Sequence, residues 1–223
     1  MKNLTLIIPA KNEHESLPLV LEELKKYDLK TKVVLSSEDQ LTINAIQKFD
    51  IEIIYQKNKG YGDALIDGIN SLDDGFFCIF NADGSFDPKE LKQMYDKIIE
   101  KNYDFLFASR YEDKSGSEDD TFLTWLGNKI FTLLGKIIFS LNITDILYTF
   151  VIGKVSHYKK LNIRSLDFGF CVELPIMAKK NKMMLTTSPS YERKRIAGIK
   201  KVSEFRDGSL ILLKMIKLIF RSK

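Results

Sequence analysis

Short apolar runs and amphipathic segments alternate through the first half of the chain. The runs contain few polar residues, as expected for strands that are covered on both faces of a parallel sheet. Between them, apolar residues recur three or four positions apart, which is the spacing of a helix with one buried face. This alternation predicts a single α/β domain whose mostly parallel sheet is flanked by helices. The expected strands are 4–8, 32–35, 51–55, 76–80 and 104–108, and the expected helices are about 15–26, one through 43–46, one after the glycine-bearing loop 56–62, and one through 91–98.

The apolar run at 76–80 ends abruptly in Asn81-Ala82-Asp83-Gly84-Ser85. The following Asp87-Pro88-Lys89-Glu90 predicts a helix start, with Asp87 as N-cap, Pro88 at the first helical position and Glu90 closing a capping box. Asp83 would then lie at the carboxyl end of a strand, where open α/β sheets bind ligands. Residues 81–85 are also ordinary turn residues. The functional reading is that Asp83 holds a divalent cation against a diphosphate, with Asn81 and Ser85 adding oxygens.

The second half departs from this rhythm. An acidic loop at 111–121 precedes a predicted amphipathic helix at 125–141, on which Lys129 and Lys136 lie opposite the apolar arc. That arc fits either core packing or contact with a membrane surface or partner. Residues 185–188 predict a returning strand, and residues 210–221 a helix with a stripe of Lys214, Lys217 and Arg221. Both apolar helices contain lysine and fall short of about 20 residues, so neither is expected to span a membrane.

The composition argues against several kinds of partner and active site. With 223 residues and 44% hydrophobic content, the chain can bury one good core. A net charge of +4 is too small to indicate a nucleic-acid partner. The two histidines, His14 and His157, disfavour a histidine-rich zinc site and a Ser-His-Asp triad. Two cysteines in apolar stretches and an N-terminus without a signal-peptide pattern predict a cytoplasmic location.

Six motifs in one order resemble the family 2 glycosyltransferases, with the dolichyl-phosphate mannose synthase-like branch as the nearest group. Each motif is short and weak alone, but their order is specific, and they cover nearly all of the chain up to Gly208. They are Ile7-Ile8-Pro9-Ala10-Lys11-Asn12-Glu13, Asn58-Lys59-Gly60-Tyr61-Gly62-Asp63-Ala64, Asn81-Ala82-Asp83-Gly84-Ser85-Phe86-Asp87-Pro88, Ala108-Ser109-Arg110-Tyr111, Thr144-Asp145-Ile146-Leu147-Tyr148-Thr149-Phe150, and the segment 191–202.

The resemblance implies a Rossmann-like GT-A fold and an inverting transfer of a sugar from a nucleotide diphosphate donor, UDP- or GDP-linked. The acceptor is left open between a polyprenyl phosphate and a glycan. A GT-A domain is expected at 1–208, with a nucleotide-sugar half at 1–110 and an acceptor half at 111–208. A basic amphipathic helix at 209–223 would follow, and it could touch the inner face of a membrane.

The resemblance also implies roles for individual residues. Asp83, with Asn81 and Ser85, would hold Mg²⁺ or Mn²⁺ against the diphosphate, and the leaving group would be stabilised there. Glycines at 60 and 62 would let the backbone approach the nucleotide. Phosphate-binding cations are expected at Arg110, Arg193, Arg195 and Lys201, and a solvated basic face is the alternative for them. Nucleotide contacts are expected from Pro9, Ala10, Lys11, Glu13, Ser36, Asp39, Asn58, Gly60, Gly62, Asp63, Asn81 and Ala82.

The need for a catalytic base depends on the acceptor. A lipid phosphate is already anionic, so positioning and diphosphate stabilisation suffice. A sugar hydroxyl needs a carboxylate to take its proton, and Asp145 and Glu173 are the candidates. Both could equally be ordinary loop or helix-cap acids.

Two departures from the family pattern keep a second hypothesis open. Asn81 stands where the family's first metal-motif acid is expected, so one anionic ligand is missing. The loop Leu35-Ser36-Ser37-Glu38-Asp39 lacks the usual paired aspartates, which leaves the choice of base open. A catalytically degenerate protein that binds a nucleotide sugar or acts as a scaffold would also fit these changes.

Overall fold

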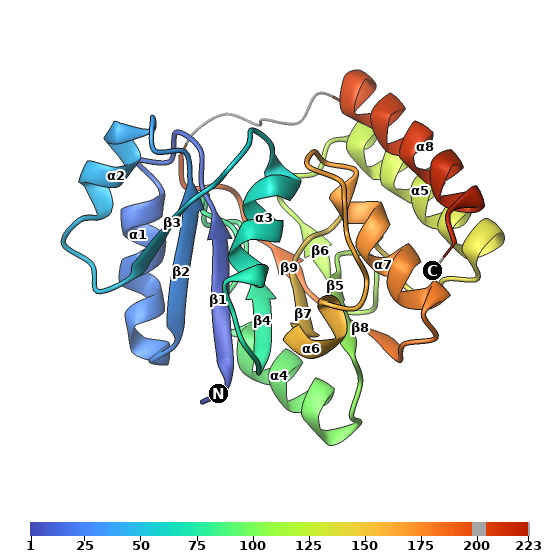
Figure 1. Ribbon diagram of the computed structural model, residues 1–223, viewed down its shortest axis with the longest axis horizontal. Coiled ribbons are helices and arrows are strands. Elements are labelled where there is room, and N and C mark those ends of the chain that lie inside the picture. The colour runs from blue at the N-terminus through green and yellow to red at the C-terminus, as the bar shows by residue number, and fades with distance from the viewer. Residues whose placement is uncertain (198–203, 223) are drawn as a thin grey trace.

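The structure is a computed structural model that describes residues 1–197 and 204–222. Its main sheet has seven strands in the order β3-β2-β1-β4-β7-β5-β8 (Figure 1). All are parallel except β7, which runs antiparallel to its neighbours β4 and β5. The strands are β1 Leu4–Pro9, β2 Lys30–Leu35, β3 Glu52–Tyr55, β4 Phe76–Ile79, β5 Phe105–Ser109, β7 Val151–Lys154 and β8 Leu185–Pro189. A second, two-stranded sheet joins β6 Gly116–Ser117 to β9 Tyr191–Glu192.

Helices cover both faces of the main sheet because side chains alternate along each strand. On β1, Leu6 and Ile8 pack into the core cluster that contains α1 and α4, whereas Ile7 packs into the cluster that contains α3 and α7. This arrangement confirms the predicted α/β class with a mostly parallel, flanked sheet. The helices are α1 Leu17–Leu24, the 3-10 turn η1 Lys25–Tyr27, α2 Gln40–Ile46, α3 Tyr61–Asn70, α4 Glu90–Glu100, α5 Phe122–Phe139, α6 Val155–Tyr158, α7 Phe170–Lys180 and α8 Glu204–Phe220.

Strand β7 was not predicted from the sequence. It is four residues long and is inserted between two strands that precede it in the chain. Gly153 at its centre allows the fit, because a Cβ there would lie 2.5 Å from the Phe105 ring and 2.8 Å from the Phe77 ring. Its antiparallel direction interrupts the parallel sheet that the strand-helix alternation implied.

The start of α4 differs from the predicted capping box. The helix begins at Glu90, and its N-cap Lys89 makes no side-chain cap. Asp87 instead accepts the Lys89 amide at 3.0 Å, which closes a turn before the helix. The Glu90 carboxylate accepts the Tyr191 amide at 2.7 Å and so binds a distant strand rather than its own helix end.

The sheet changes its winding direction at β1. From β1 the chain moves outward to β2 and β3 on one side, and then returns to add β4 on the other. The carboxyl ends of β1 and β4 therefore flank the crevice where open α/β sheets place their ligands. Pro9 and residues 80–83 lie at this crevice.

Helix α8 is fastened to the domain by a buried carboxylate on α7. Glu173 is fully buried, and one of its oxygens accepts the Ser165 amide at 2.6 Å and pairs with Lys214 of α8 at 3.1 Å. Its other oxygen pairs with Arg221, just beyond α8. Burial alone would raise the pKa of Glu173, but the hydrogen bonds from Ser165 and the charge of Lys214 hold it below the usual carboxyl value. Figure 1 shows α8 lying alongside α5 and α7.

Replacing this carboxylate should loosen α8. We expect Glu173→Gln to lower the free energy of unfolding by about 3 kcal/mol, because it leaves two cations without their partner. The pKa of Glu173 is depressed in the folded state, so its contribution is complete at neutral pH and is lost as pH falls through the folded pKa. Chemical denaturation of both proteins at neutral and acidic pH measures the difference, which should shrink in acid.

The matched control is Glu22→Gln, which breaks an exposed pair with Lys25 and should change the stability little. Equal effects of the two substitutions, or a Glu173→Gln deficit that persists in acid, would contradict the assignment.

Candidate active site

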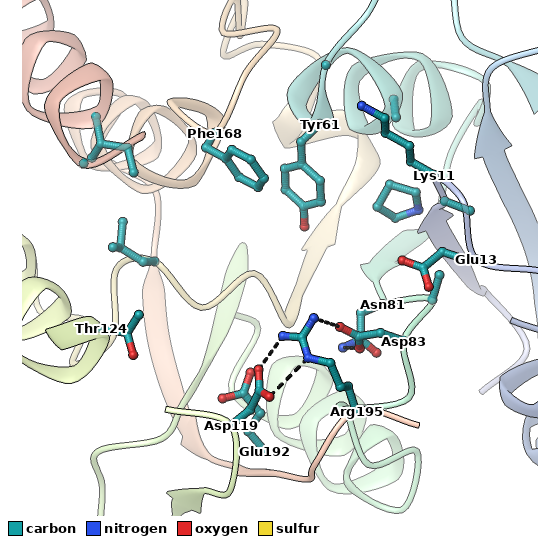
Figure 2. Close-up of a pocket in the computed structure, with 18 of the residues that line it drawn as sticks. Lys11, Glu13, Tyr61, Asn81, Asp83, Asp119, Thr124, Phe168, Glu192 and Arg195 are labelled. Atoms are coloured by element: carbon teal, nitrogen blue, oxygen red, sulfur yellow. Dashed lines mark hydrogen bonds and ion pairs between the residues drawn. The ribbon is translucent and has the colours of Figure 1, made fainter. Parts of the chain in front are cut away.

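A cavity of about 690 Å³ opens at the carboxyl edge of the sheet. One side of it is polar and is formed by the loops after β1, β2, β3 and β4. The opposite side is largely apolar and is formed by α5, α8 and nearby loops. Figure 2 shows Thr124 of α5 across the cavity from Asp83. The polar side includes Pro9, Ala10, Lys11, Glu13, Ser36, Asp39, Gly60, Asn81, Ala82 and Asp83, and the apolar side includes Leu123, Gly127, Phe131, Leu147, Phe168 and Ile211.

The loops after β1 and β2 hold each other in place. Asp39 accepts the Thr42 amide as the N-cap of α2, and its other oxygen accepts the Asn12 amide at 2.6 Å. The Glu13 amide donates to the Thr42 hydroxyl at 2.9 Å. Asn12 adopts a left-handed backbone, with φ of 53°, at the turn that makes these contacts. The polar side of the cavity is therefore ordered by hydrogen bonds between loops that are 27 to 29 residues apart.

The two glycines at the start of α3 lie against the backbone of another segment. A Cβ at Gly60 would lie 2.0 Å from the Leu166 carbonyl oxygen, and one at Gly62 would lie 2.1 Å from that of Ser165. The glycines thus admit the backbone of residues 165–167, although Gly60 also lines the cavity. Asn58 and Asp63 are bonded to each other at 2.7 and 2.9 Å. Neither of them lines the cavity, and Gly62 does not line it either.

Asp83 lies in the cavity on a turn that its own neighbours shape. Its Oδ1 accepts the Ser85 amide at 3.0 Å and the side-chain amide of Asn81. Asn81 also donates to the Ser85 hydroxyl and accepts the Phe86 amide at 3.2 Å. The turn reading of residues 81–85 is confirmed, and the turn leaves the second oxygen of Asp83 on the cavity side (Figure 2).

Of the three predicted metal ligands, only Asp83 offers an anionic oxygen to the cavity. Ser85 is buried and does not line it, and the described residues contain no group of three or more His, Cys, Asp or Glu side chains that could hold a metal. Proteins commonly hold Mg²⁺ through one or two carboxylates together with substrate phosphates and water. The residues present fit an ion that is shared with a bound diphosphate, and not a site made by protein alone.

Arg195 is the cation that faces Asp83. Its guanidinium spans two acids, pairing with both oxygens of Asp119 and lying 3.8 Å from Oδ2 of Asp83 (Figure 2). The hydrogen bond to Asp119 raises the pKa of Arg195. This side chain therefore already neutralises part of the negative charge of Asp83 and Asp119.

Arg110 also reaches the cavity but is largely committed to carboxylates. It pairs with Asp145 at 2.8 Å, Asp120 at 3.2 Å and Glu192 at 3.0 Å. Burial raises the pKa of Glu192, although the charge of Arg110 opposes that rise. Four of the five guanidinium N–H groups are used in these contacts, so Arg110 orders the acidic floor of the cavity.

Several predicted residues lie elsewhere. Asp145 is 1% exposed, gives both oxygens to Arg110 and does not line the cavity. Glu173 is buried against α8, as described above. Arg193 forms a two-pronged pair with Glu23 and donates to the Phe86 carbonyl. Lys201 falls outside the described residues. The geometry gives Asp145 and Glu173 structural ion pairs in place of the base roles expected for them.

The structure adds cavity residues that were not predicted. Tyr61 and Phe168 stack with ring centroids 5.0 Å apart, and both line the cavity (Figure 2). Asp119 and Asp120 also line the cavity, and they come from the acidic loop 111–121. The negative charge of that loop was the only feature of the sequence that pointed to these two residues. Asn128 of α5 lines the cavity as well. It was not predicted, because in the sequence it is one polar residue among several on an amphipathic helix.

The helices of the apolar wall also expose apolar side chains on the outside. By length and composition alone, helix α5 is long and apolar enough to cross a membrane, and only 17% of it is buried. That is weak evidence for spanning, because the same helix packs on α7 and α8. Side chains that are at least two-fifths exposed include Phe122, Trp125, Ile130, Leu133, Ile137 and Ile138 on α5, and Leu210, Leu212, Leu213, Ile216, Ile219 and Phe220 on α8. We call this surface the α5–α8 face.

The chain is similar to several sugar transferases in sequence and to solved structures in fold. A UDP-N-acetylglucosamine–dolichyl-phosphate N-acetylglucosaminyltransferase from Methanococcus voltae is 23% identical over 213 residues, covering 84% of each chain. An undecaprenyl-phosphate 4-deoxy-4-formamido-L-arabinose transferase from Serratia proteamaculans is 29% identical over 49% of this chain and 37% of its own.

The fold is similar to that of a glucosyl-3-phosphoglycerate synthase from Mycobacterium tuberculosis, solved with Mn²⁺, UDP and its product. The TM-score is 0.76 at 12% identity, covering all of this chain and 81% of that one. The profile of glycosyl transferase family 2 matches residues 5–161. The chain belongs to glycosyl transferase family 2, a family of sugar-transferring enzymes, and has the GT-A fold.

Proposed function

We propose that this protein transfers a sugar, with inversion, from a nucleoside diphosphate donor to a polyprenyl phosphate at a membrane surface. The observation that carries the proposal is the two-sided cavity. Its polar side suits a nucleotide diphosphate, and its apolar side is made by the same two helices that expose the α5–α8 face. A polar donor and a lipid acceptor would meet inside it.

The donor would lie along the carboxyl edge of the sheet. Pro9, Lys11, Ser36 and Asp39 line the part of the cavity that is nearest β1 and β2, where the base and ribose would bind. The diphosphate would then reach Asp83 and Arg195. A uridine or guanosine base is compatible with these residues, and UDP is the first choice because it is named for the Methanococcus relative.

Asp83 would hold Mg²⁺ or Mn²⁺ once the diphosphate is bound. When bound, the ion supplies positive charge that stabilises the diphosphate as it leaves. Arg195 would turn from Asp83 to a phosphate oxygen, for which a guanidinium is well shaped. Manganese in the mycobacterial structure supports a divalent ion in this fold.

The residues that line the cavity favour a lipid phosphate over a glycan as the acceptor. A lipid phosphate attacks as an anion, so it needs positioning rather than a general base. A glycan hydroxyl would need a free carboxylate, but Asp119, Asp120 and Glu192 are each engaged by an arginine. Both named relatives act on prenyl phosphates. Direct attack on the donor, without a covalent enzyme intermediate, gives inversion.

The α5–α8 face would rest on the cytoplasmic surface of an anionic membrane. Exposed Lys136 and Lys217 lie on the same two helices, and cations beside apolar side chains are typical of helices that lie in the bilayer interface. In this orientation the lipid phosphate would reach the cavity without leaving the membrane.

The donor site is tested by thermal stabilisation. We expect UDP or GDP, alone and as nucleotide sugars, to raise the melting temperature more with Mn²⁺ than without it. A ligand at 100 times its Kd stabilises by about 2.7 kcal/mol. Asp83→Asn should remove the manganese-dependent part and keep the rest. Absence of any nucleotide shift, or an unchanged manganese effect in Asp83→Asn, would contradict the proposed site.

Restoring the acid at position 81 tests the shared-ion geometry separately. Asn81→Asp should lower the stability of the ligand-free protein by about 1–2 kcal/mol, because the hydrogen bond to Asp83 is lost and a like charge is placed beside that carboxylate. It should also tighten Mn²⁺ binding in the presence of UDP, as titration calorimetry would show. Unchanged stability together with weaker metal binding would refute this geometry.

Membrane contact is tested with a matched pair of exposed leucines. Leu133 on α5 and Leu19 on α1 are both 55% exposed. We expect Leu133→Glu to weaken flotation with anionic phospholipid vesicles by about tenfold or more, because one buried leucine is worth about 1.5–3 kcal/mol. Leu19→Glu should leave flotation unchanged. Equal losses in both variants, or no binding by the wild type, would rule out docking through this face.

A further inference from the structure

Asn128 brings an unused hydrogen-bond donor to the apolar side of the cavity. It lies on α5, lines the cavity and is 3% exposed. Its Oδ1 is fully buried and has no partner among the described residues. Its Nδ2 keeps accessible surface and donates no hydrogen bond to any described residue. The amide therefore turns its donor end, rather than its acceptor, toward the cavity.

This amide does not serve the fold in the way that its neighbour does. A buried acceptor without a partner is costly, and native proteins rarely keep one without a reason. Thr132, one turn further along α5, accepts the Ile146 amide at 3.2 Å and so ties the helix to the following loop. Asn128 makes no such tie to the described residues at either end of its amide. Its Nδ2 is therefore available to a ligand that accepts a hydrogen bond.

Two glycines on the helices of the apolar side leave empty space in the cavity wall. Gly127 on α5 and Gly208 on α8 both line the cavity, and a Cβ at either position would meet nothing from the rest of the described chain within 4 Å. Gly135 of α5 is different, because a Cβ there would lie 3.0 Å from Ile146 and 3.1 Å from Leu141. Glycine inside a helix is destabilising relative to alanine. Packing explains the glycine at position 135, but no described residue needs the space at positions 127 and 208.

The donor and the empty space occur together on the helices that form the α5–α8 face. Helices α5 and α8 pack against each other, and Figure 1 shows them side by side. Gly127 directly precedes Asn128 on α5, and the outer sides of both helices are apolar. This part of the cavity therefore belongs to the surface that is proposed to rest on a membrane.

A prenyl phosphate matches this combination. Its one polar group is an ionised phosphate, which accepts hydrogen bonds, and the rest of it is a flexible hydrocarbon chain. A hydrogen bond from Asn128 to a charged oxygen is stronger than one to a neutral group. The chain would fill the space beside Gly127 and Gly208 without leaving a polar group unpaired. A sugar fits this stretch of wall less well, because its several hydroxyl groups would meet mostly apolar side chains.

We infer that Asn128 donates a hydrogen bond to the phosphate of a prenyl phosphate acceptor, and that the hydrocarbon chain leaves the cavity across Gly127 and Gly208, between α5 and α8. The inference rests on the proposed function and adds the residues that recognise the acceptor. Asn128 holds the phosphate, and the two helix positions without side chains admit the chain. The phosphate stays ionised and able to attack, because an amide donates a hydrogen bond without giving up its proton.

The test separates the phosphate from the chain with two ligands. Farnesyl phosphate and farnesol share one hydrocarbon chain, and only the first carries a phosphate. We expect the wild type to bind farnesyl phosphate more tightly than farnesol, as measured by titration calorimetry. Asn128→Leu should weaken the binding of farnesyl phosphate by about tenfold or more, because a hydrogen bond to a charged group is lost. It should leave the binding of farnesol intact.

Gly127→Leu tests the route of the chain. A leucine side chain would fill the space in the cavity wall, so both ligands should bind about tenfold more weakly. Gly208→Leu should have the same effect from α8. UDP with Mn²⁺ should raise the melting temperature of each variant, as it does for the wild type, which shows that the variant is folded.

Thr132→Val is the matched control on α5. It should lower the melting temperature, because the Ile146 amide loses its acceptor, and it should leave the affinities for both prenyl ligands unchanged. Full affinity of Asn128→Leu for farnesyl phosphate would overturn the inference, as would unchanged farnesol binding in both glycine variants. A wild type that binds UDP with Mn²⁺ but neither prenyl ligand is a different result, and it would overturn the proposed acceptor together with this inference.

Discussion

The cavity depends on two arginines that hold a cluster of acids together. Arg110 joins Asp145, Asp120 and Glu192, and Arg195 joins Asp119 to Asp83. These acids come from separate loops and strands, and without the guanidinium groups their charges would force the elements apart. The same floor remains richer in negative than in positive groups. An incoming diphosphate would therefore meet repulsion at Asp83 unless a further cation came with it, which is the physical reason to expect a divalent ion at this edge.

The two sides of the cavity come from different parts of the chain, and one side is polar whereas the other is largely apolar. The β1, β2 and β4 loops are ordered by hydrogen bonds and form the polar side of the cavity. Helices α5 and α8 are held to the domain through α7, and the buried Glu173 supplies the charge that fixes α8. Their inner surfaces line the cavity and their outer surfaces are apolar. An enzyme that joins a water-soluble sugar donor to a lipid requires a site with one polar side and one apolar side.

Local sequence patterns predicted the six parallel strands of the main sheet and most of the residues on the polar side of the cavity. The edge residues from Pro9 to Glu13 and from Asn81 to Asp83 were predictable because each follows directly from an apolar strand. Features that depend on distant partners were not predictable. Glu173 pairs with Lys214 and with Arg221, and Arg221 is 48 residues away along the chain. Asp145 pairs with Arg110, which is 35 residues before it.

Gly60 and Gly62 carried a correct signal for close backbone approach, but the sequence does not show that residues 165–167 are what approach. Strand β7 was missed because four residues around a glycine carry almost no periodic signal. Asn128 was missed for a related reason, since one polar position in a helix is unremarkable until the cavity beside it is seen.

The central claim is that the cavity joins a nucleotide sugar to a lipid phosphate. It is tested most directly by incubating the protein with a radiolabelled nucleotide sugar and vesicles that contain polyprenyl phosphate, and then measuring the label that extracts into organic solvent. The account predicts label in the organic phase that requires the polyprenyl phosphate and a divalent ion. Label that is transferred only to a water-soluble acceptor, with none in the lipid, would contradict it.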